Sequence, residues 1–238
     1  MRVAVVTGAS SGIGAALCRA LRGRGRHVVG LSRSPAPDAD EYEPCDVSDR
    51  AAVDAVAARV LERHPRLELL VNNAGIGGRT TFTAADPELI EALVRTNYLG
   101  SVWCLRAFLP GLGAGSHVVN VASVAGLVAV GPYSAAKHAQ VAFSRSVAVE
   151  LAGRGISVHT VNPGFVETPG FPQRGRFRGA AYRLVAQPEL VVERILAAIE
   201  HDRREVVVPR WYAPSAWLQA VAPGALARLL ARAGPRGV

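Results

Sequence analysis

The stretch that decides the fold is residues 3–17, which read VAVVTGASSGIGAAL. The apolar run 3–7 predicts a buried strand, and the apolar residues after Gly14 predict that a helix follows at once. Glycines suit the turn between them because they permit a tight bend, close backbone approach to a ligand and close helix packing. The free N–H groups of this helix start would face a pyrophosphate. The turn therefore predicts a dinucleotide site, although a plain strand–helix turn can share the pattern; its residues are Gly8, Ser10, Ser11, Gly12, Ile13 and Gly14.

Short apolar runs and longer helical patterns alternate along the rest of the chain. Strands are predicted at 3–7, 27–32, 67–72, 117–122, 156–161 and 205–208, with a less regular run at 41–45. Helices are predicted at 11–24, 48–63, 86–112, 133–152 and 188–201. This alternation predicts an α/β fold with residues 1–238 as a single domain. The expected architecture is a doubly wound parallel sheet (Rossmann fold) of about seven strands with helices on both faces.

Two segments depart from this alternation. Residues 168–187 are rich in Gly, Pro and Arg and are long for a plain connection, which predicts a substrate lid. The lid arginines favour an anionic or phosphate-bearing substrate; they are Arg174, Arg176, Arg178 and Arg183. Residues 209–238 form an apolar C-terminal extension with a helical pattern. We expect the extension to pack over the chain's own sheet or pocket rather than on a membrane or a partner subunit.

Composition limits the classes of protein that fit. The 238 residues are 50% apolar and carry a formal net charge of +8, which excludes a disordered or collagen-like chain and suggests an anionic partner. No apolar run is long enough to span a membrane, no signal peptide precedes Gly8, and the three cysteines form no disulfide pattern. We therefore expect a soluble cytoplasmic protein. The histidine spacing predicts no metal site, and no motif predicts hydrolase chemistry or nucleic-acid binding.

One lysine, Lys137, stands among 27 basic residues, and all the others are arginines. Tyr133 precedes it by one helical turn, so the phenol and the ammonium are expected side by side. Acid–base chemistry near neutrality requires that the pKa of the phenol fall from about 10, and a nearby cation can lower it. A pair at this spacing is also common on exposed helix faces. The lone lysine and the glycine turn together favour a catalytic role for Tyr133 and Lys137.

The end of the second predicted strand indicates which dinucleotide binds. A carboxylate at this place would bind the ribose hydroxyls of NAD, but the chain has Ser32 and Arg33. Arg33 can pair with a 2′-phosphate, and no carboxylate is there to repel one. This pattern favours NADP(H) over NAD(H). The alternative is that Arg33 is a solvated loop residue.

Motifs throughout residues 1–208 occur in a characteristic order. They are T-G-x-x-x-G-I-G at 7–14, Asp46-Val47, N-N-A-G at 72–75, Asn97, Ser123, Tyr133-x-x-x-Lys137 and P-G-x-x-x-T at 163–168. This combination resembles the short-chain dehydrogenase/reductase family. The resemblance implies an NAD(P)-dependent enzyme that moves hydride between the nicotinamide and a carbonyl or alcohol carbon. A non-catalytic NADP-binding scaffold or sensor of the same fold remains the alternative.

The resemblance also implies roles for individual residues. Tyr133 would be the general acid/base, and Lys137 would lower its pKa and hold the nicotinamide ribose, so both would also contact the cofactor. Ser123 would bind the substrate oxygen, and Asn97 would hold a water that relays protons to Lys137. The remaining cofactor contacts would be Asp46, Val47, Asn73, Ala74, Gly75, Pro163, Gly164, Val166 and Thr168.

Two further expectations come from the family. Only nine residues separate Ser123 from Tyr133, a few fewer than the family usually has. The shorter loop would leave the substrate pocket more open or displace Ser123. Family members often form dimers or tetramers through the helices near 97–112 and 133–152, so a homodimer or homotetramer is expected.

Overall fold

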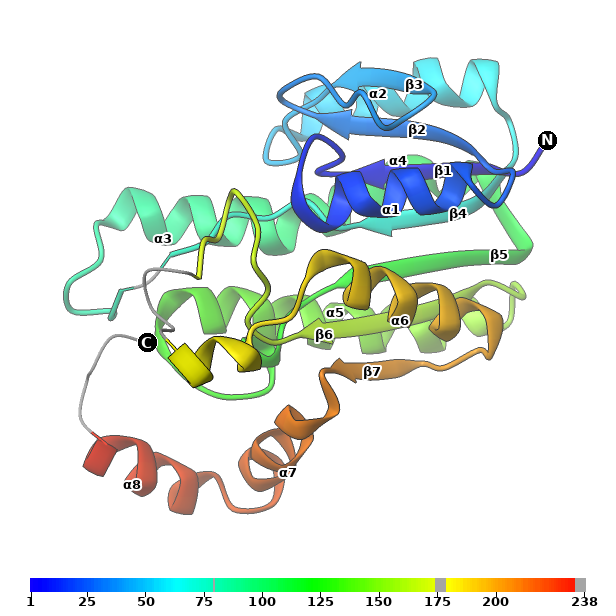
Figure 1. The fold of residues 1–238 in the computed structure, drawn as a ribbon. Coiled ribbons are helices and arrows are strands. Elements are labelled where there is room, and N and C mark those ends of the chain that lie inside the picture. The colour runs from blue at the N-terminus through cyan, green and yellow to red at the C-terminus, as the bar shows by residue number, and fades with distance from the viewer. Residues whose placement is uncertain (79, 174–178, 234–238) are drawn as a thin grey trace.

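A parallel sheet of seven strands forms the centre of the computed structural model, which describes residues 1–78, 80–173 and 179–233 (Figure 1). The strand order is β3-β2-β1-β4-β5-β6-β7. The strands are β1 (Val3–Thr7), β2 (His27–Ser32), β3 (Glu41–Pro44), β4 (Leu67–Asn72), β5 (Leu112–Val121), β6 (Ser157–Pro163) and β7 (Glu205–Val208). The chain runs from β1 outward to β3 and then returns to β4 on the other side of β1. The predicted doubly wound sheet is confirmed, and this change of direction is where such sheets bind ligands.

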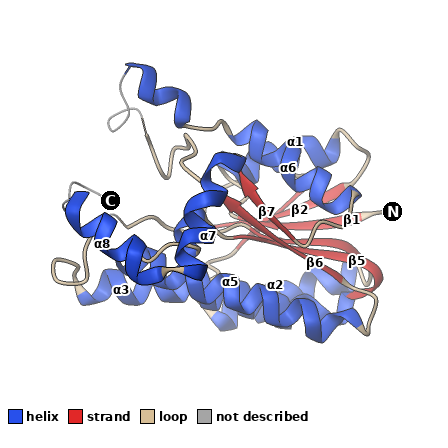
Figure 2. Ribbon diagram, turned by 90° about the horizontal axis from the view of Figure 1, so that it is seen from below, coloured by secondary structure: helices blue, strands red, loops and turns tan. Residues whose placement is uncertain are grey.

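Helices cover both faces of the sheet (Figure 2). On one face α1 (Gly12–Arg22) and α6 (Pro188–Glu200) pack against each other, and Leu17 and Ile195 are completely buried there. The other face carries α2 (Arg50–Arg63), α4 (Gly100–Phe108) and α5 (Gly131–Ala152), with Val53, Phe108 and Leu151 in its core. Because both faces are covered, the strands are apolar on both sides rather than alternating.

The helix predicted over 86–112 is divided in the structure. It begins as α3 (Pro87–Val94), continues through a π-helical turn (Arg95–Leu99) into α4, and ends in a 3-10 turn (Leu109–Gly111). Pro110 has no amide N–H and its ring disfavours further helix, which explains the end of the helical segment. Strand β5 consequently begins at Leu112 and not at 117 as predicted.

The C-terminal extension differs in part from the prediction. A 3-10 turn (Arg210–Tyr212), α7 (Ala213–Val221) and α8 (Pro223–Ala233) follow β7, the strand at the sheet edge (Figure 1). Tyr212 and Ser215 line the main cavity, as expected for packing over a pocket. Trp217, however, is 68% exposed, and Leu229 is exposed as well, because α7 and α8 lie beyond the edge of the sheet. None of the described helices is long and apolar enough to cross a membrane.

Phe108 is the largest completely buried side chain of the described core. We expect Phe108→Ala to lower the free energy of unfolding by about 3–5 kcal/mol, because it removes buried apolar area and leaves a cavity. Urea denaturation measures this change. Phe82→Ala is the matched control, since Phe82 is 57% exposed, and it should have little effect. Equal losses in both variants would contradict the assigned core.

Candidate active site

A cavity of about 740 Å³ opens at the carboxyl ends of the central strands. Its walls come from the glycine turn after β1 and from the segments that follow β2, β4, β5 and β6. All the site residues predicted from the sequence line this cavity except Gly14, which lies behind the turn. The predicted positions are therefore brought together although they are spread from residue 8 to residue 168.

The glycine turn leaves room that side chains would fill. Gly8 and Gly12 have φ values of +66° and +55°, in the left-handed region that favours glycine. A Cβ at Gly14 would lie 2.1 Å from the carbonyl oxygen of Gly8, so the helix could not pack here with any side chain. Ser11 precedes α1 without a side-chain cap among the described contacts, which leaves the first backbone N–H groups for a ligand. This backbone cradle fits a pyrophosphate.

The loop after β4 is fixed to the end of β1. The Thr7 hydroxyl donates to the Val71 carbonyl (3.2 Å) and accepts from the backbone N–H groups of Asn73 and Ala74 (3.0 Å each). The Asn73 amide in turn donates to the Thr7 carbonyl at 2.9 Å. These bonds hold residues 73–75 against the glycine turn, where Asn73, Ala74 and Gly75 line the cavity.

Arg33 and Asp46 lie at the far end of the cavity. Arg33 is exposed, and the described residues give its side chain no hydrogen bond or ion pair. The Asp46 carboxylate accepts from the Ser48 backbone N–H (2.9 Å) and hydroxyl (2.7 Å), which fixes its orientation. Asp46 is the one acidic residue among the described residues that line the cavity. The Arg33 guanidinium is therefore available to pair with an anionic group of a ligand in this part of the cavity.

Lys137 is buried in α5 beneath the cavity. Its Nζ donates to the Val121 carbonyl (3.1 Å) and to Oε1 of Gln140 (2.8 Å). Gln140 is completely buried, and its Nε2 donates to the Ser101 hydroxyl at 2.9 Å. Burial lowers the pKa of Lys137 to about 7. Gln140 was not predicted from the sequence; its spacing of three from Lys137 on one helix was the available signal.

Tyr133 lies beside Lys137 as its helical spacing predicts. The Lys137 Nζ is 5.9 Å from the centroid of the Tyr133 ring. Burial raises the pKa of Tyr133 to about 12, and a hydrogen bond with Ser123 only partly offsets that rise. This direction is opposite to the lowered pKa expected from the sequence. The physical reason is that burial favours the uncharged form of each group, so the protein's own residues stabilise a neutral phenol.

The short loop before α5 keeps Ser123 at the site. Ser123 Oγ lies 3.3 Å from the Pro163 carbonyl, accepts from the Ala125 N–H at 3.1 Å, and lines the same cavity as Tyr133. A 3-10 turn (Val124–Gly126) follows, and the Ser134 hydroxyl closes the loop through the carbonyls of Ala125 and Val128. Ser123 is therefore not displaced by the loop length. The closing role of Ser134 was not predicted.

Asn97 lies in the π-helical turn and is completely buried. Its side chain bonds the backbone of Ile76 twice, because Oδ1 accepts from the N–H (2.9 Å) and Nδ2 donates to the carbonyl (3.0 Å). A Cβ at Gly75 would lie 2.7 Å from this Oδ1, which explains the glycine there. An exposed helix position for Asn97 is thus excluded. Isolated π turns are frequent at functional sites.

One wall of the cavity is aromatic. The Phe171 ring stacks on the Tyr133 ring with centroids 6.1 Å apart, and the Tyr212 ring occupies the space that a Cβ at Gly164 would need. Pro163, Val166 and Thr168 complete this wall. Of the predicted lid arginines, Arg183 is exposed, whereas Arg174, Arg176 and Arg178 lie outside the described residues. Neither Phe171 nor Tyr212 was predicted, because no local pattern marks an aromatic wall.

A family model described as short chain dehydrogenase matches residues 2–178. The chain belongs to this family. A dehydrogenase/reductase SDR family protein 7-like from Anopheles gambiae is 33% identical over 93% of this chain and 80% of its own length. A Streptomyces coelicolor protein named as a ketoacyl reductase is 39% identical, and the match covers 70% of this chain and 71% of that protein's length. This chain is therefore an oxidoreductase that acts on CH–OH or C=O groups.

Solved structures of the family superpose on most of the chain. A Burkholderia cenocepacia short chain dehydrogenase in complex with NADP has a TM-score of 0.83 and 31% identity, covering 97% of this chain and 100% of its own. A Burkholderia phymatum short chain dehydrogenase/reductase in complex with NAD has a TM-score of 0.81 and 26% identity, with 92% of each chain covered. The fold of this dehydrogenase, a sheet with helices on both faces, is therefore the same as that of its solved relatives.

Lys137 can be observed by itself because the chain contains no other lysine. We expect isotope-labelled lysine to give one side-chain resonance in the protein without added nucleotide, and burial should make it titrate near pH 7. An unperturbed lysine titrates near pH 10.4. NMR titration of this resonance measures the pKa. A value of about 10 would contradict the buried position of the ammonium.

The same shift predicts how stability depends on pH. Between about pH 7 and 10 the unfolded chain binds more protons at Lys137 than the folded chain, so this group makes folding more favourable as pH rises. We expect the parent protein to gain stability relative to Lys137→Met across this window. Urea denaturation at several pH values measures it, and a constant difference between the two proteins would contradict the shift.

Proposed function

We propose that this protein is an NADP(H)-dependent oxidoreductase that transfers hydride between the nicotinamide and a carbonyl or alcohol substrate. The observation that carries the proposal is that Ser123, Tyr133 and Lys137 line the same cavity as the glycine turn. A nucleotide held by the turn can extend through the cavity toward these hydroxyls. When bound, the nicotinamide supplies or accepts the hydride.

The raised pKa of Tyr133 suits it to donate a proton. At neutral pH its phenol is protonated, which is the form required to protonate a carbonyl oxygen during reduction. Ser123 lines the same cavity and would bind the same substrate oxygen as negative charge develops on it. In the oxidation direction Tyr133 would act as the base, and the positive charge of an oxidised nicotinamide would favour its phenolate.

Lys137 and Asn97 would support this proton transfer. A lysine ammonium has three N–H donors, and the described protein acceptors of Lys137 account for two of them. The third is available for the ribose hydroxyl or for a water that relays protons. Asn97 fixes the backbone of Ile76, and a Cβ at the preceding Gly75 would lie 3.7 Å from the Lys137 Nζ. We assign the relay water to the π-helical turn that contains Asn97.

The cofactor contacts follow from the lining of the cavity. The diphosphate would lie on Gly8, Ser10, Ser11, Gly12 and Ile13, with the adenine near Asp46 and Val47. Arg33 would pair with a 2′-phosphate, which is why we propose NADP(H) over NAD(H). The solved relatives include complexes with NAD and with NADP, so the preference depends on Arg33.

Other parts of the proposal concern substrate and assembly. A ketoacyl compound belongs among the test substrates, because one relative carries that name. Residues 168–187 would act as the substrate lid, and residues 209–238 as an extension whose start closes the cavity. Val149 on α5 is 79% exposed, which supports a homodimer or homotetramer formed through this helix. Three buried free thiols support a reducing, cytoplasmic location.

We expect Tyr133→Phe to reduce turnover by at least about 100-fold, because the variant has no proton to give. NADPH oxidation, followed by absorbance across neutral, acidic and ketoacyl carbonyl compounds, measures turnover, and NADPH fluorescence measures binding. Tyr42→Phe is the control, since Tyr42 is exposed and outside the cavity. NADPH binding without turnover of any compound in the parent would instead support a sensor.

We expect Arg33→Gln to weaken NADPH binding about 10- to 100-fold, because a charge-assisted contact is lost. NADH binding should change little, since NADH has no 2′-phosphate. Titration of both nucleotides by fluorescence measures the two affinities. Arg24→Gln is the matched control, because Arg24 is an exposed arginine outside the cavity. Equal losses for NADPH and NADH would remove the proposed preference.

A further inference from the structure

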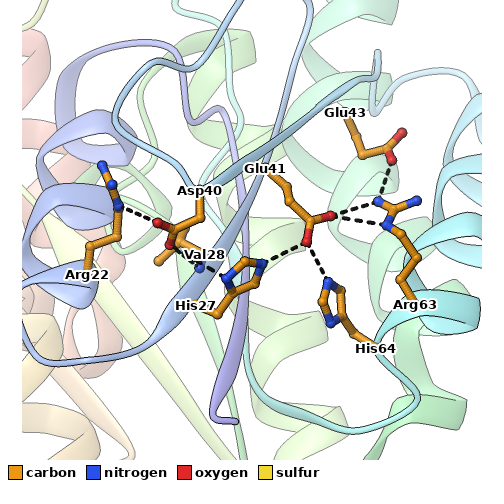
Figure 3. A network of polar contacts seen from close by, with 8 residues as sticks. All are labelled: Arg22, His27, Val28, Asp40, Glu41, Glu43, Arg63 and His64. Carbon is orange, nitrogen blue, oxygen red and sulfur yellow. Dashed lines mark hydrogen bonds and ion pairs between the residues drawn. The ribbon is translucent and has the colours of Figure 1, made fainter.

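Three side chains from separate elements converge at the end of the sheet opposite the cavity. His27 is the first residue of β2, Glu41 is the first residue of β3, and His64 directly follows α2. Figure 3 shows both imidazoles directed toward the Glu41 carboxylate. None of the three lines the cavity of the proposed enzyme. We call them the His27–Glu41–His64 cluster.

The donor atoms of the cluster are close enough to share one ion. Each Nε2, of His27 and of His64, lies 2.7 Å from the same carboxylate oxygen, Oε1 of Glu41. One ligand atom from each residue lies within 4.8 Å of the other two. Tetrahedral bonds of about 2.0 Å would place ligand atoms about 3.3 Å apart. Each histidine nitrogen therefore needs to move only a fraction of an ångström away from the Glu41 oxygen to reach the spacing that an ion requires.

The surrounding groups hold these donors in position. The other Glu41 oxygen, Oε2, accepts from Nε and Nη2 of Arg63 (3.1 and 3.0 Å). On His27, Nδ1 lies 4.0 Å from an Asp40 carboxylate oxygen. A carboxylate ligand in a metal site is typically oriented by hydrogen bonds of the kind that Arg63 makes to Glu41. The side of the carboxylate that faces the histidines is thus separate from the side that faces arginine (Figure 3).

The donor set selects a class of ion. Two imidazoles and one carboxylate suit Zn²⁺ and its transition-metal neighbours, whereas Mg²⁺ and Ca²⁺ prefer oxygen ligands. Nearby carboxylates and guanidiniums pair with one another: Arg22 with Asp40, and Arg59 and Arg63 with Glu43. Because these carboxylates are neutralised by arginines, the surroundings carry no excess negative charge that would attract any cation. The choice of ion therefore depends on the two imidazoles and the Glu41 carboxylate. The side chains of His27 and Glu41 are 24% and 28% exposed, so solvent can supply a fourth ligand.

We propose that His27, Glu41 and His64 bind one Zn²⁺-class ion. The ion would link the starts of β2 and β3 to the end of α2. Strand β3 is at the sheet edge, is only four residues long and pairs with β2 alone among the described strands. A metal link at its first residue would therefore brace the least supported strand of the sheet. The role is structural, because the cluster lies apart from the cavity.

The test is a calorimetric titration of the untagged, metal-free protein with Zn²⁺ in a buffer that does not chelate it. We expect one ion per chain. His27→Gln and His64→Gln should each weaken binding by more than about tenfold, because each removes a ligand. His201→Gln is the matched control: His201 is an exposed histidine after α6, and its loss should leave the affinity unchanged.

Two further measurements keep the proposal testable if a variant folds poorly. Co²⁺ bound to the parent protein should show the intense visible absorption of a four-coordinate ion, and Zn²⁺ should raise the melting temperature by several degrees. Circular dichroism establishes whether each metal-free variant is folded. Absence of binding to the parent, or binding unchanged in folded His27→Gln and His64→Gln, would overturn the proposal. So would binding that is lost only in His117→Gln, because His117 pairs with His159 elsewhere.

Discussion

The Thr7 hydroxyl bridge between β1 and β4 is the contact on which the site depends. A doubly wound sheet opens where the connections lead to one side of β1 and then to the other, and the ends of the parallel strands there must still be held together. Thr7 does this by bonding three backbone groups of the neighbouring strand end. The glycine turn and residues 73–75 are consequently fixed on either side of one opening, which becomes the cavity.

Burial governs the chemistry of the two titratable groups beneath that opening. The same removal from water lowers the pKa of Lys137 and raises that of Tyr133, so both groups favour their neutral forms. Buried polar atoms require partners, and Gln140 and Ser101 continue the hydrogen bonds of Lys137 into the core. A phenol that keeps its proton is a suitable acid for carbonyl reduction. A positively charged ligand beside the Tyr133 phenol would favour the phenolate form.

Strands β2 and β3 connect the two sites proposed for this dehydrogenase. Their first residues, His27 and Glu41, belong to the histidine cluster, and the residues just beyond their ends include Arg33 and Asp46 of the cavity. The intervening chain is also fixed, because Asp40 accepts from the Val28 N–H and from Arg22. The edge of the sheet that we propose to bind the adenosine half of the cofactor is therefore supported at its opposite end.

The sequence by itself determined the elements whose causes are local. Apolar runs, the left-handed glycines of the first turn, the spacing of Tyr133 and Lys137, and Arg33 after β2 all depend on neighbouring residues, so the sheet and part of the cavity lining were predictable. The other predicted lining residues came from the resemblance to a known family. Tertiary structure decided the rest. The bonds of Asn97 to Ile76, the aromatic wall at Phe171 and the His27–Glu41–His64 cluster join residues that are distant in sequence. The direction of the Tyr133 pKa shift also depended on burial, which no sequence spacing records, because the cost of a charge is set by how much water the folded chain removes from it.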